Sequence, residues 1–573
     1  MNFPIRGLEI HSQRMWNWES VRRTLELCEL LEINTLVFHQ NELLDDLMIP
    51  EDCLTDAVVW DRWPLRQSRA LRRERYIMRV ISACRDKGID FYMEIKEPWF
   101  PSDIFDIIPD LKNDQGVICP THPFWNEYVG AKVRKAVKEL PGLAGIIVSP
   151  ATFETKLTIA ANGCGCERCR RTSARQWYSG LIRSMYVPLQ QAKKRLIVRD
   201  FAYTEADQNN VIEACHDVSK EITVSLKAVP HDYWPTFPDN PKIGNVGELR
   251  QWIEYDVWGQ YMGCGLFPVS MIRDLRRRLF HCLQCGAEGV VFRTDWEHLQ
   301  DCSVVNSLNM LNLFAGGMLA KNPEQDQSAI YRAYCTYGIN SPLRDESALI
   351  PPEVPSAGDA PALLEAFMEK SYETMIATLY VRGHVMQYSS RFHHSFNFVD
   401  YVLLEHHTLE YWKPGALREI EPNLENLAII YREKAFAEQA YRELAGMDLP
   451  GKLGVSMALR ADLEEMIELY GWYVRVFGLV CHSYFDLRIA LDDASEEKIA
   501  QVEKDIKELE ALAHDLDKRM NGTQYPRYVY WLLSPETLLH FVRDMKTTSL
   551  MVGKSKYTFG EYDRSHIFET QVV

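Results

Sequence analysis

The segment "ITVSLKAVPHDYWPTFPDNPKIG", residues 222–244, starts as an apolar strand and continues as a proline-rich loop. Lys227 lies near the end of the strand, and His231 and Asp232 follow it beside aromatic residues. Charged residues at the end of an apolar strand indicate either ion pairs or a functional site, because an unpaired charge is costly to bury. The pattern predicts a strand that delivers charged side chains to a pocket, with a long loop over 231–247 as one wall.

The same pattern recurs along the first 300 residues, where short apolar runs alternate with amphipathic helical stretches. One such stretch, over 124–140, repeats its apolar residues at helical spacing. Near-continuous apolar strands are typical of parallel sheets covered on both faces. Eight strand–helix units predict a (β/α)8 barrel. The predicted strands are 6–11, 34–40, 90–96, 145–150, 195–203, 222–230, 254–261 and 289–295.

The character of the sequence changes near residue 321, after which long helical patterns replace the strands. Clear examples are 423–447 and 495–520, both amphipathic. We therefore predict a barrel domain over 1–320 and an α-helical domain over 321–573. The helical domain would cover part of the barrel mouth or form a homodimer interface, and the sequence leaves both possibilities open.

Composition and charge exclude several classes of function. The chain has 573 residues and a net charge of -16, which disfavours binding to nucleic acid. It has no apolar run of about 18 uncharged residues that would cross a membrane, and it does not begin with a basic and then apolar leader. We expect a cytoplasmic protein whose 14 cysteines are mostly free thiols.

Active sites of (β/α)8 barrels lie at the C-terminal ends of the strands. Several carboxylates with aromatic residues between them indicate a glycoside hydrolase, which needs one carboxylic acid and a second carboxylate as base or nucleophile. Arg199 and Lys227 end adjacent strands, so they would either hold an anionic group such as a uronate or neutralise nearby carboxylates. The polar residues expected at the strand ends are Glu94, Glu97, Ser149, Glu154, Arg199, Asp200, Lys227, His231, Asp232, Glu254, Asp256, Gln260, Arg293, Asp295 and Glu297.

Five segments, taken in their order along the chain, resemble glycoside hydrolase family 67, the α-glucuronidases. They are "EINTLVFHQN" (32–41), "LPGLAGIIVSPATFE" (140–154), "RLIVRDFAY" (195–203), "ITVSLKAVPHDYWP" (222–235) and "EYDVWGQYMG" (254–263). The chain differs from the family in having Gln260 where the family has a glutamate, and in lacking the family's N-terminal β domain.

The resemblance implies roles for several residues. Glu154 would be the general acid and Asp232 the base, while Arg199 and Lys227 would bind the uronate carboxylate. Such a pair implies inversion, with the two carboxyl groups about 6.5–9.5 Å apart to leave room for water. The same motifs add further candidates for binding the oligosaccharide substrate, namely His231, Trp258 and Gln260.

Two other interpretations stay open. One is a barrel hydrolase of another specificity whose working carboxylates are Asp295 and Glu297, or Glu94 and Glu97. The other is a carbohydrate-binding barrel without activity, for which Gln260 is the best indication.

The cysteines at 164, 166 and 169 form a C-x-C-x2-C cluster. Cys164, Cys166 and Cys169 would bind structural zinc if a fourth ligand came from elsewhere, such as Cys119, His122 or another histidine. The alternative is a set of free thiols in a tight turn. We expect no other metal and no cofactor. The histidine pairs at 393–394 and 406–407 are predicted to be surface or capping residues.

Overall fold

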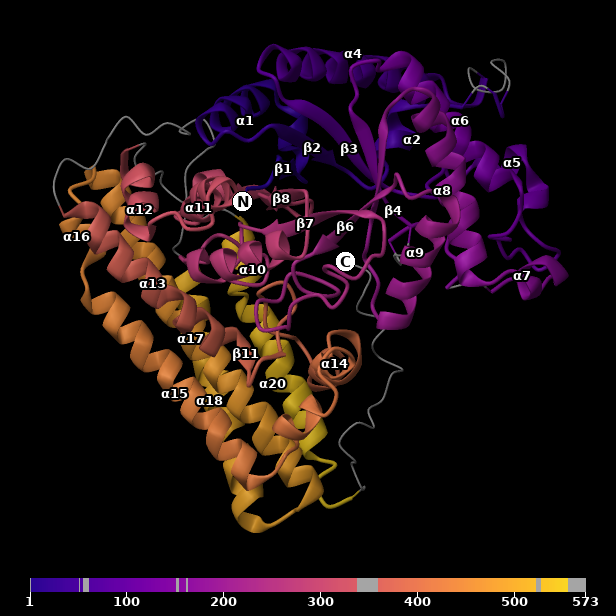
Figure 1. Cartoon of the computed structure of the whole chain (residues 1–573). Helices are drawn as coiled ribbons and strands as arrows, with labels where there is room; N and C mark the ends of the chain where they lie inside the picture. Colours follow the sequence, from indigo (N-terminus) through magenta and orange to yellow (C-terminus); the bar gives the residue numbers. More distant parts are fainter. Residues whose placement is uncertain are drawn as a thin grey trace.

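The computed structural model describes residues 2–50, 52–54, 61–150, 154–160, 163–336, 359–521 and 527–554. Its first part is a barrel, and its second part is a layer of long helices that extends from one side of the barrel (Figure 1). No helix in these ranges combines the length and the apolar character that a bilayer crossing requires.

Eight parallel strands close the barrel in sequence order. The first and last strands pair directly, with Gly7 opposite Val291. The predicted (β/α)8 fold, followed by a helical region, is therefore confirmed. The strands are β1 (Ile5–Ile10), β2 (Thr35–His39), β3 (Asp90–Lys96), β4 (Gly145–Ser149), β5 (Arg195–Arg199), β6 (Thr223–Lys227), β7 (Arg250–Asp256) and β8 (Gly289–Arg293).

The seventh strand lies earlier in the sequence than predicted. It spans Arg250–Asp256, whereas the prediction placed it at 254–261. The Asp256 carboxylate ends the strand, because it accepts hydrogen bonds from the backbone N–H groups of residues 258 to 260 at 2.6–3.2 Å. Gly259 then takes φ of +88°, a left-handed conformation that glycine adopts without strain.

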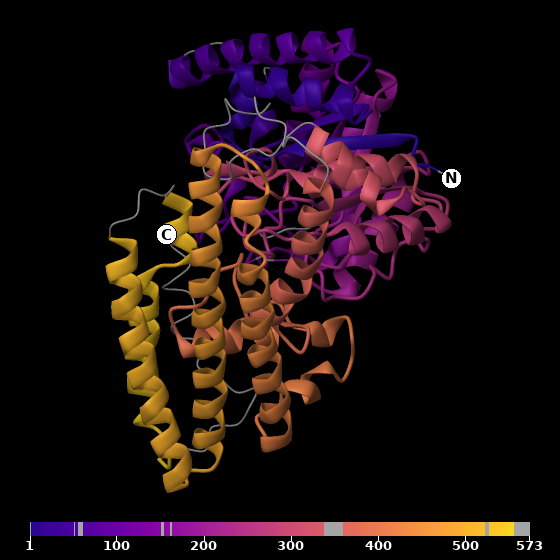
Figure 2. The same cartoon turned by 90° about the vertical axis from the view of Figure 1, so that its left-hand side faces the viewer.

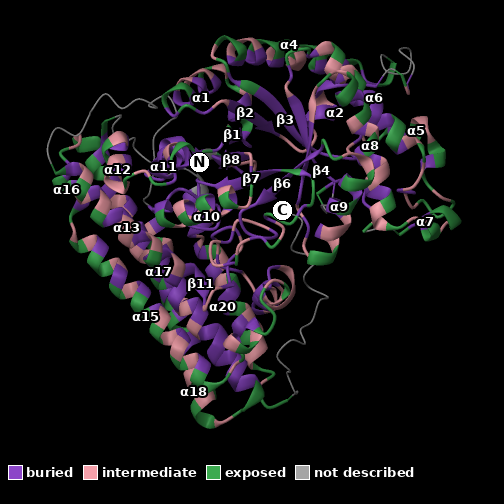
Figure 3. Ribbon diagram, viewed as in Figure 1, coloured by how far each residue is buried: buried purple, intermediate pink, exposed green. Residues whose placement is uncertain are grey.

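Helices cover the outside of the barrel, whose strands are buried (Figure 3). Between β6 and β7, the described residues 228–249 form turns and bends rather than a helix, as their proline and glycine content predicts. The covering helices are α1 (Trp18–Leu30), α4 (Pro64–Asp86), α6 (Phe124–Glu139), α8 (Ala174–Gln191), α9 (Glu205–Val218), α10 (Ile272–Gln284) and α11 (Met310–Lys321).

The interior of the barrel is divided into an apolar half and a polar half. The apolar cluster includes Trp252 and Tyr92, whose rings meet edge to face at 5.2 Å. Towards the C-terminal ends of the strands the buried residues are charged, among them Glu9, Glu94 and Glu254. The apolar half supplies packing, and the polar half faces the mouth, where barrel sites form.

The second part consists mainly of long helices that lie side by side (Figure 2). Helix α13 packs on α15, α15 on α17, α17 on α18, and α18 on α20. Their bounds, with that of α12, are α12 (Gln327–Thr336), α13 (Ala360–Leu379), α15 (Leu424–Gly446), α17 (Met457–Asp492), α18 (Glu496–Met520) and α20 (Pro535–Ser549).

A segment between α13 and α15 reaches back to the barrel mouth. The Gln260 side-chain amide donates to Ser389 Oγ at 3.0 Å, and Ser390 Oγ donates to the Gln260 carbonyl at 2.7 Å. The backbone N–H of Gly263 also donates to Ser390 Oγ, at 2.8 Å. The helical part therefore covers part of the mouth, which is one of the two roles that the sequence left open.

Candidate active site

A cavity of about 100 Å³ opens at the C-terminal ends of the strands. Three carboxylates, three cations and several aromatic rings line it, and the segment around residues 388–407 closes one side. The charged lining residues are Glu154, Asp232, Glu297, Lys96, Arg199 and Arg293. The other lining residues are His11, His39, Phe201, Tyr203, His231, Tyr233, Gln260, Tyr261, Trp296, Tyr388, Ser389, His406 and His407.

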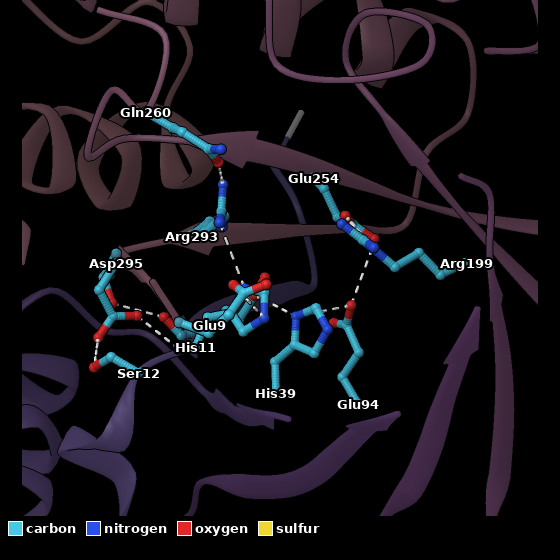
Figure 4. A network of polar contacts seen from close by, with 12 residues as sticks. Glu9, His11, Ser12, His39, Glu94, Arg199, Glu254, Gln260, Arg293 and Asp295 are labelled. Carbon is cyan, nitrogen blue, oxygen red and sulfur yellow. Dashed lines mark hydrogen bonds and ion pairs between the residues drawn. The ribbon is translucent and has the colours of Figure 1, made fainter. Parts of the chain in front are cut away.

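Beneath the cavity, charged side chains of the inner barrel form a network of ion pairs (Figure 4). Arg199 Nε lies 2.7 Å from Glu254 and 3.0 Å from Glu94. His39 Nδ1 lies 2.8 Å from Glu9 and 3.2 Å from Glu94. The strand register places these residues at similar heights, since His39 pairs with Glu94 across β2 and β3.

Burial and neighbouring charges give the three carboxyl groups beneath the cavity, Glu9, Glu94 and Glu254, different pKa values. Burial raises the pKa of Glu94 to about 7, although Arg199 opposes the shift. Burial also raises the pKa of Glu9 well above its usual range, and the Glu94 carboxylate adds to this. Burial acts in the same direction on Glu254, but Arg199 and Lys227 outweigh it and lower the pKa of that carboxyl. Glu254 is thus the ionised partner of Arg199.

Arg293 differs from Arg199 in its partners. Its Nη1 donates to the side-chain oxygen of Gln260, and its Nη2 lies 3.5 Å from His11 Nδ1. Within the described ranges, no carboxylate forms an ion pair with Arg293, whereas Arg199 has two. Arg293 is therefore a buried cation that lines the cavity and keeps the capacity to bind an anion.

One wall of the cavity combines Lys96, Glu154, Glu297 and His11. Lys96 ends β3 and forms an ion pair with Glu154. Burial lowers the pKa of Lys96 to about 7, so its charge changes near neutral pH. Glu297 Oε2 lies 2.9 Å from His11 Nε2. Burial opposes ionisation of Glu297, but His11, Lys96 and Arg293 outweigh it and hold the pKa of this carboxyl below its usual range.

The Asp232 side is organised by the turn after β6. His231 adopts φ of +66°, which is strained for a residue with a side chain. Its ring packs on Tyr203 at 4.1 Å, and its carbonyl accepts a hydrogen bond from Lys227 Nζ at 3.0 Å. The Tyr261 hydroxyl donates to the Asp232 carboxylate, which also accepts from the backbone N–H of Tyr233 at 3.0 Å. These contacts hold Asp232 at the cavity edge.

The structure brings together most of the site residues predicted from sequence. Glu154, Arg199, His231, Asp232, Gln260 and Glu297 all line the cavity. Of the remaining candidates, Glu94 lies in the network beneath it, and Glu97 is buried against Lys132, with Glu97 Oε1 2.8 Å from Lys132 Nζ.

The cavity lining also excludes Trp258, Lys227 and Asp295. The Trp258 side chain is fully buried and donates through Nε1 to Cys302 Sγ at 3.3 Å, so it packs in the core. Lys227 is turned towards its own strand end, where it binds the His231 carbonyl. The Asp295 carboxylate accepts hydrogen bonds from the His11 backbone N–H and from Ser12 Oγ, both at 2.6 Å, and therefore fixes the chain after β1.

Several lining residues were absent from the sequence-based candidates. His11 and His39 lie at the ends of the first two predicted strands, where the same rule of polar residues at strand ends would have found them. For the pair at 406–407, predicted as surface or capping residues, His407 does cap the helix Val402–His406. It is nevertheless buried, and both rings line the cavity, stacked at 4.1 Å. These histidines come from the helical part, whose position over the mouth has no signal in the local sequence.

Two groups of side chains in the described ranges have the composition of metal ligands. Glu9, His11 and His39 offer ligand atoms within 4.8 Å of one another, and the two imidazole rings stack at 3.6 Å. In this group Glu9 already pairs with His39 as part of the network beneath the cavity. The second group contains Cys119, Cys164, Cys166 and Cys169, and it lies outside the cavity lining.

Comparisons with known proteins identify the fold. No protein-family model matches the chain, and no curated protein matches its sequence. Among solved structures, a GH138 enzyme targeting pectin rhamnogalacturonan II is similar, with a TM-score of 0.62 and 11% sequence identity over 97% of this chain and 69% of that one. An O-GlcNAc hydrolase of Thermobaculum terrenum has a TM-score of 0.43 and 12% identity over 96% of this chain and 97% of that one. At 11% identity the similarity to the GH138 enzyme concerns the fold alone.

Proposed function

We propose that the protein is a glycoside hydrolase that acts on an oligosaccharide bearing a uronic acid or a related acidic sugar. The observation that carries the proposal is the convergence of Glu154, Asp232 and Glu297 on one cavity at the C-terminal ends of the strands. Glycosidic cleavage requires two carboxyl groups on opposite sides of the bond. The rings of Phe201 and Tyr233 add the flat apolar surface that sugars bind.

In the proposed reaction Glu154 is the general acid and Asp232 the general base. Glu154 protonates the glycosidic oxygen as the bond to the anomeric carbon breaks. A water molecule attacks that carbon and gives its proton to Asp232, which inverts the configuration. The Lys96 ammonium, in contact with Glu154, is placed to return a proton to it after each turnover. The products are the two sugars, with the elements of water added across the bond.

Arg293 is our choice for the residue that binds the sugar carboxylate. Arg199 is already paired with Glu254 and Glu94, and Lys227, which is not in the cavity lining, donates to the His231 backbone carbonyl. Arg293 has an amide as its hydrogen-bond partner instead, so its guanidinium could form a direct ion pair with a substrate carboxylate. A hydrogen bond to a charged group contributes about 1.5–3 kcal/mol, which corresponds to about 10- to 150-fold in affinity.

Glu297 supports an alternative assignment within the same function. It lines the cavity, and its lowered pKa keeps it ionised, as a base or nucleophile requires. If Glu297 were the nucleophile, the reaction would retain configuration, and the anomer of the first product separates the two assignments.

The test is a screen of aryl glycosides and oligosaccharides, including glucuronides and galacturonides, with product anomers assigned by NMR. We expect E154Q to lose about 10²- to 10⁴-fold on substrates with poor leaving groups and much less on activated aryl glycosides. D232N should lose activity on both. Glu496→Gln, at the exposed start of α18, serves as the control and should match the unmodified chain.

Substrate charge is tested separately with Arg293→Gln and Arg293→Lys. Arg293→Gln should raise KM for a uronide about 10- to 150-fold and leave KM for the matching neutral glycoside nearly unchanged, with partial rescue in Arg293→Lys. Equal losses on both substrates would reject Arg293 as the anion-binding residue. Failure of every glycoside to be cleaved, or full activity in both E154Q and D232N, would reject the proposed hydrolase.

A further inference from the structure

We infer that Cys119, Cys164, Cys166 and Cys169 bind one structural zinc ion. Cys119 belongs to the chain between β3 and α6, after the short helix η2 (Pro109–Leu111). The other three come from the chain between β4 and α8, where Cys169 lies in the short helix α7 (Glu167–Arg171). Helix α7 lies at the edge of the molecule away from the long helices (Figure 1). The ion would join two excursions from neighbouring strands.

The sulfur positions fit a tetrahedral site. Cys119 Sγ lies 3.8 Å from Cys166 Sγ and 3.7 Å from Cys169 Sγ. A tetrahedral zinc ion with Zn–S bonds of about 2.3 Å places its sulfurs about 3.8 Å apart. All four sulfurs lie within 4.8 Å of one another, and none of these four described cysteines forms a disulfide. A disulfide would bring two sulfurs to about 2.05 Å, far closer than the separations seen.

Hydrogen-bond donors surround the sulfurs as they do around bound thiolates. The Cys169 backbone N–H donates to Cys166 Sγ at 3.4 Å, at the start of α7. Arg168 Nη2 lies 3.8 Å from Cys119 Sγ, and Thr121 Oγ1 lies 3.1 Å from Cys169 Sγ. Outer partners of this kind orient metal ligands, and the Arg168 cation offsets the negative charge of a four-thiolate zinc centre.

The surroundings of the cluster give the ion a structural role. The buried cysteines form their own small core, separate from the main core of the barrel, with Val117 packed against it. Helix α7 has five residues and is mostly exposed apart from Cys169, so it lacks the length and the buried face that stabilise helices. A metal ion that cross-links the two segments would supply the missing stability.

The site also bears on the cavity, because Glu154 lies on the same excursion as Cys164. This second consequence rests on the proposed function, whereas zinc binding does not. Loss of the ion should therefore reduce hydrolysis by loosening the segment that carries Glu154, and zinc content can be measured without any substrate.

The experiment measures the metal content of the full chain, purified without chelators, by inductively coupled plasma mass spectrometry. We expect one zinc per chain, near-complete loss in Cys119→Ser and in Cys166→Ser, and retention in Cys285→Ser, a half-buried thiol at the C-cap of α10. Replacement of zinc by cobalt should give the intense visible bands of a tetrahedral tetrathiolate site. The cobalt spectrum uses the unmodified chain, so the proposal is tested even if a cysteine variant fails to fold.

Three results would overturn the inference. One is a chain with no bound metal and four thiols that react freely. The second is a disulfide among the four cysteines, found by mass spectrometry without reduction. The third is iron in place of zinc. Zinc binding together with an inactive chain would leave this inference standing and count against the proposed hydrolase alone.

Discussion

Replacing Lys132 by methionine should strongly destabilise the barrel, because Lys132 neutralises a buried carboxylate. Its ammonium on α6 is fully buried and lies 2.8 Å and 3.0 Å from the two carboxylate oxygens of Glu97, and 2.7 Å from the Trp99 carbonyl. Lys132→Met leaves Glu97 without this partner. Removing one member of a buried ion pair costs about 3–5 kcal/mol.

The stability lost in Lys132→Met should depend on pH in a defined direction. Burial raises the pKa of Glu97 to about 7, with Lys132 opposing the shift. A carboxyl whose folded pKa lies above its unfolded value of about 4.3 stabilises the fold at low pH, and this contribution is lost as the pH rises towards the folded pKa. Without Lys132 the pKa rises further. The difference between Lys132→Met and the unmodified chain should therefore be larger at pH 8 than at pH 5, where Glu97 can be protonated.

Urea denaturation followed by tryptophan fluorescence measures the loss at both pH values. Arg134→Met is the matched control, because Arg134 lies on the same helix in an exposed pair with Asp52 and should contribute about 1 kcal/mol or less. The double variant Lys132→Met with Glu97→Gln should recover part of the loss, since the Glu97 carboxylate is then no longer buried without its partner. Equal effects of Lys132→Met and Arg134→Met, or a loss that shrinks as the pH rises, would refute the reasoning.

Two further predictions concern the cavity wall. Burial lowers the pKa of Lys96 to about 7, so below that pH the folded chain is destabilised by a buried charge. This destabilisation decreases as the pH rises from 7 towards the pKa that Lys96 has in the unfolded chain. Lys96→Met should therefore gain more stability relative to the unmodified chain at pH 6 than at pH 9, and an equal gain at both pH values would contradict the lowered pKa. Asp295→Asn removes the charge that pairs with the buried Arg14 and weakens the acceptor that holds His11 and Ser12, so it should lower the free energy of unfolding by about 3–5 kcal/mol and reduce turnover only in part. Complete loss of turnover with unchanged stability would instead make Asp295 the catalytic carboxylate.

The barrel and the helical region could be predicted from the sequence because both follow from local periodicity. Apolar runs separated by amphipathic helices specify a covered parallel sheet, and closing eight such strands brings their C-terminal ends to one mouth. This is why Asp232, Glu154 and Glu297, distant in sequence, were predicted in one site and line one cavity. The bounds of the seventh strand were predicted wrongly, because the turn at Asp256 that ends it depends on side-chain hydrogen bonds that local periodicity does not reveal.

The partners of each charge were decided only by the tertiary structure. Arg199 has the sequence context of a substrate-binding residue, yet the register of the barrel places Glu254 and Glu94 against it. Gln260 joins Arg293 to Ser389 from the helical part. Local sequence determines which side chains reach the mouth. Which of them neutralise one another depends on strand register and on contacts between residues more than a hundred positions apart, and neither is encoded in any one segment.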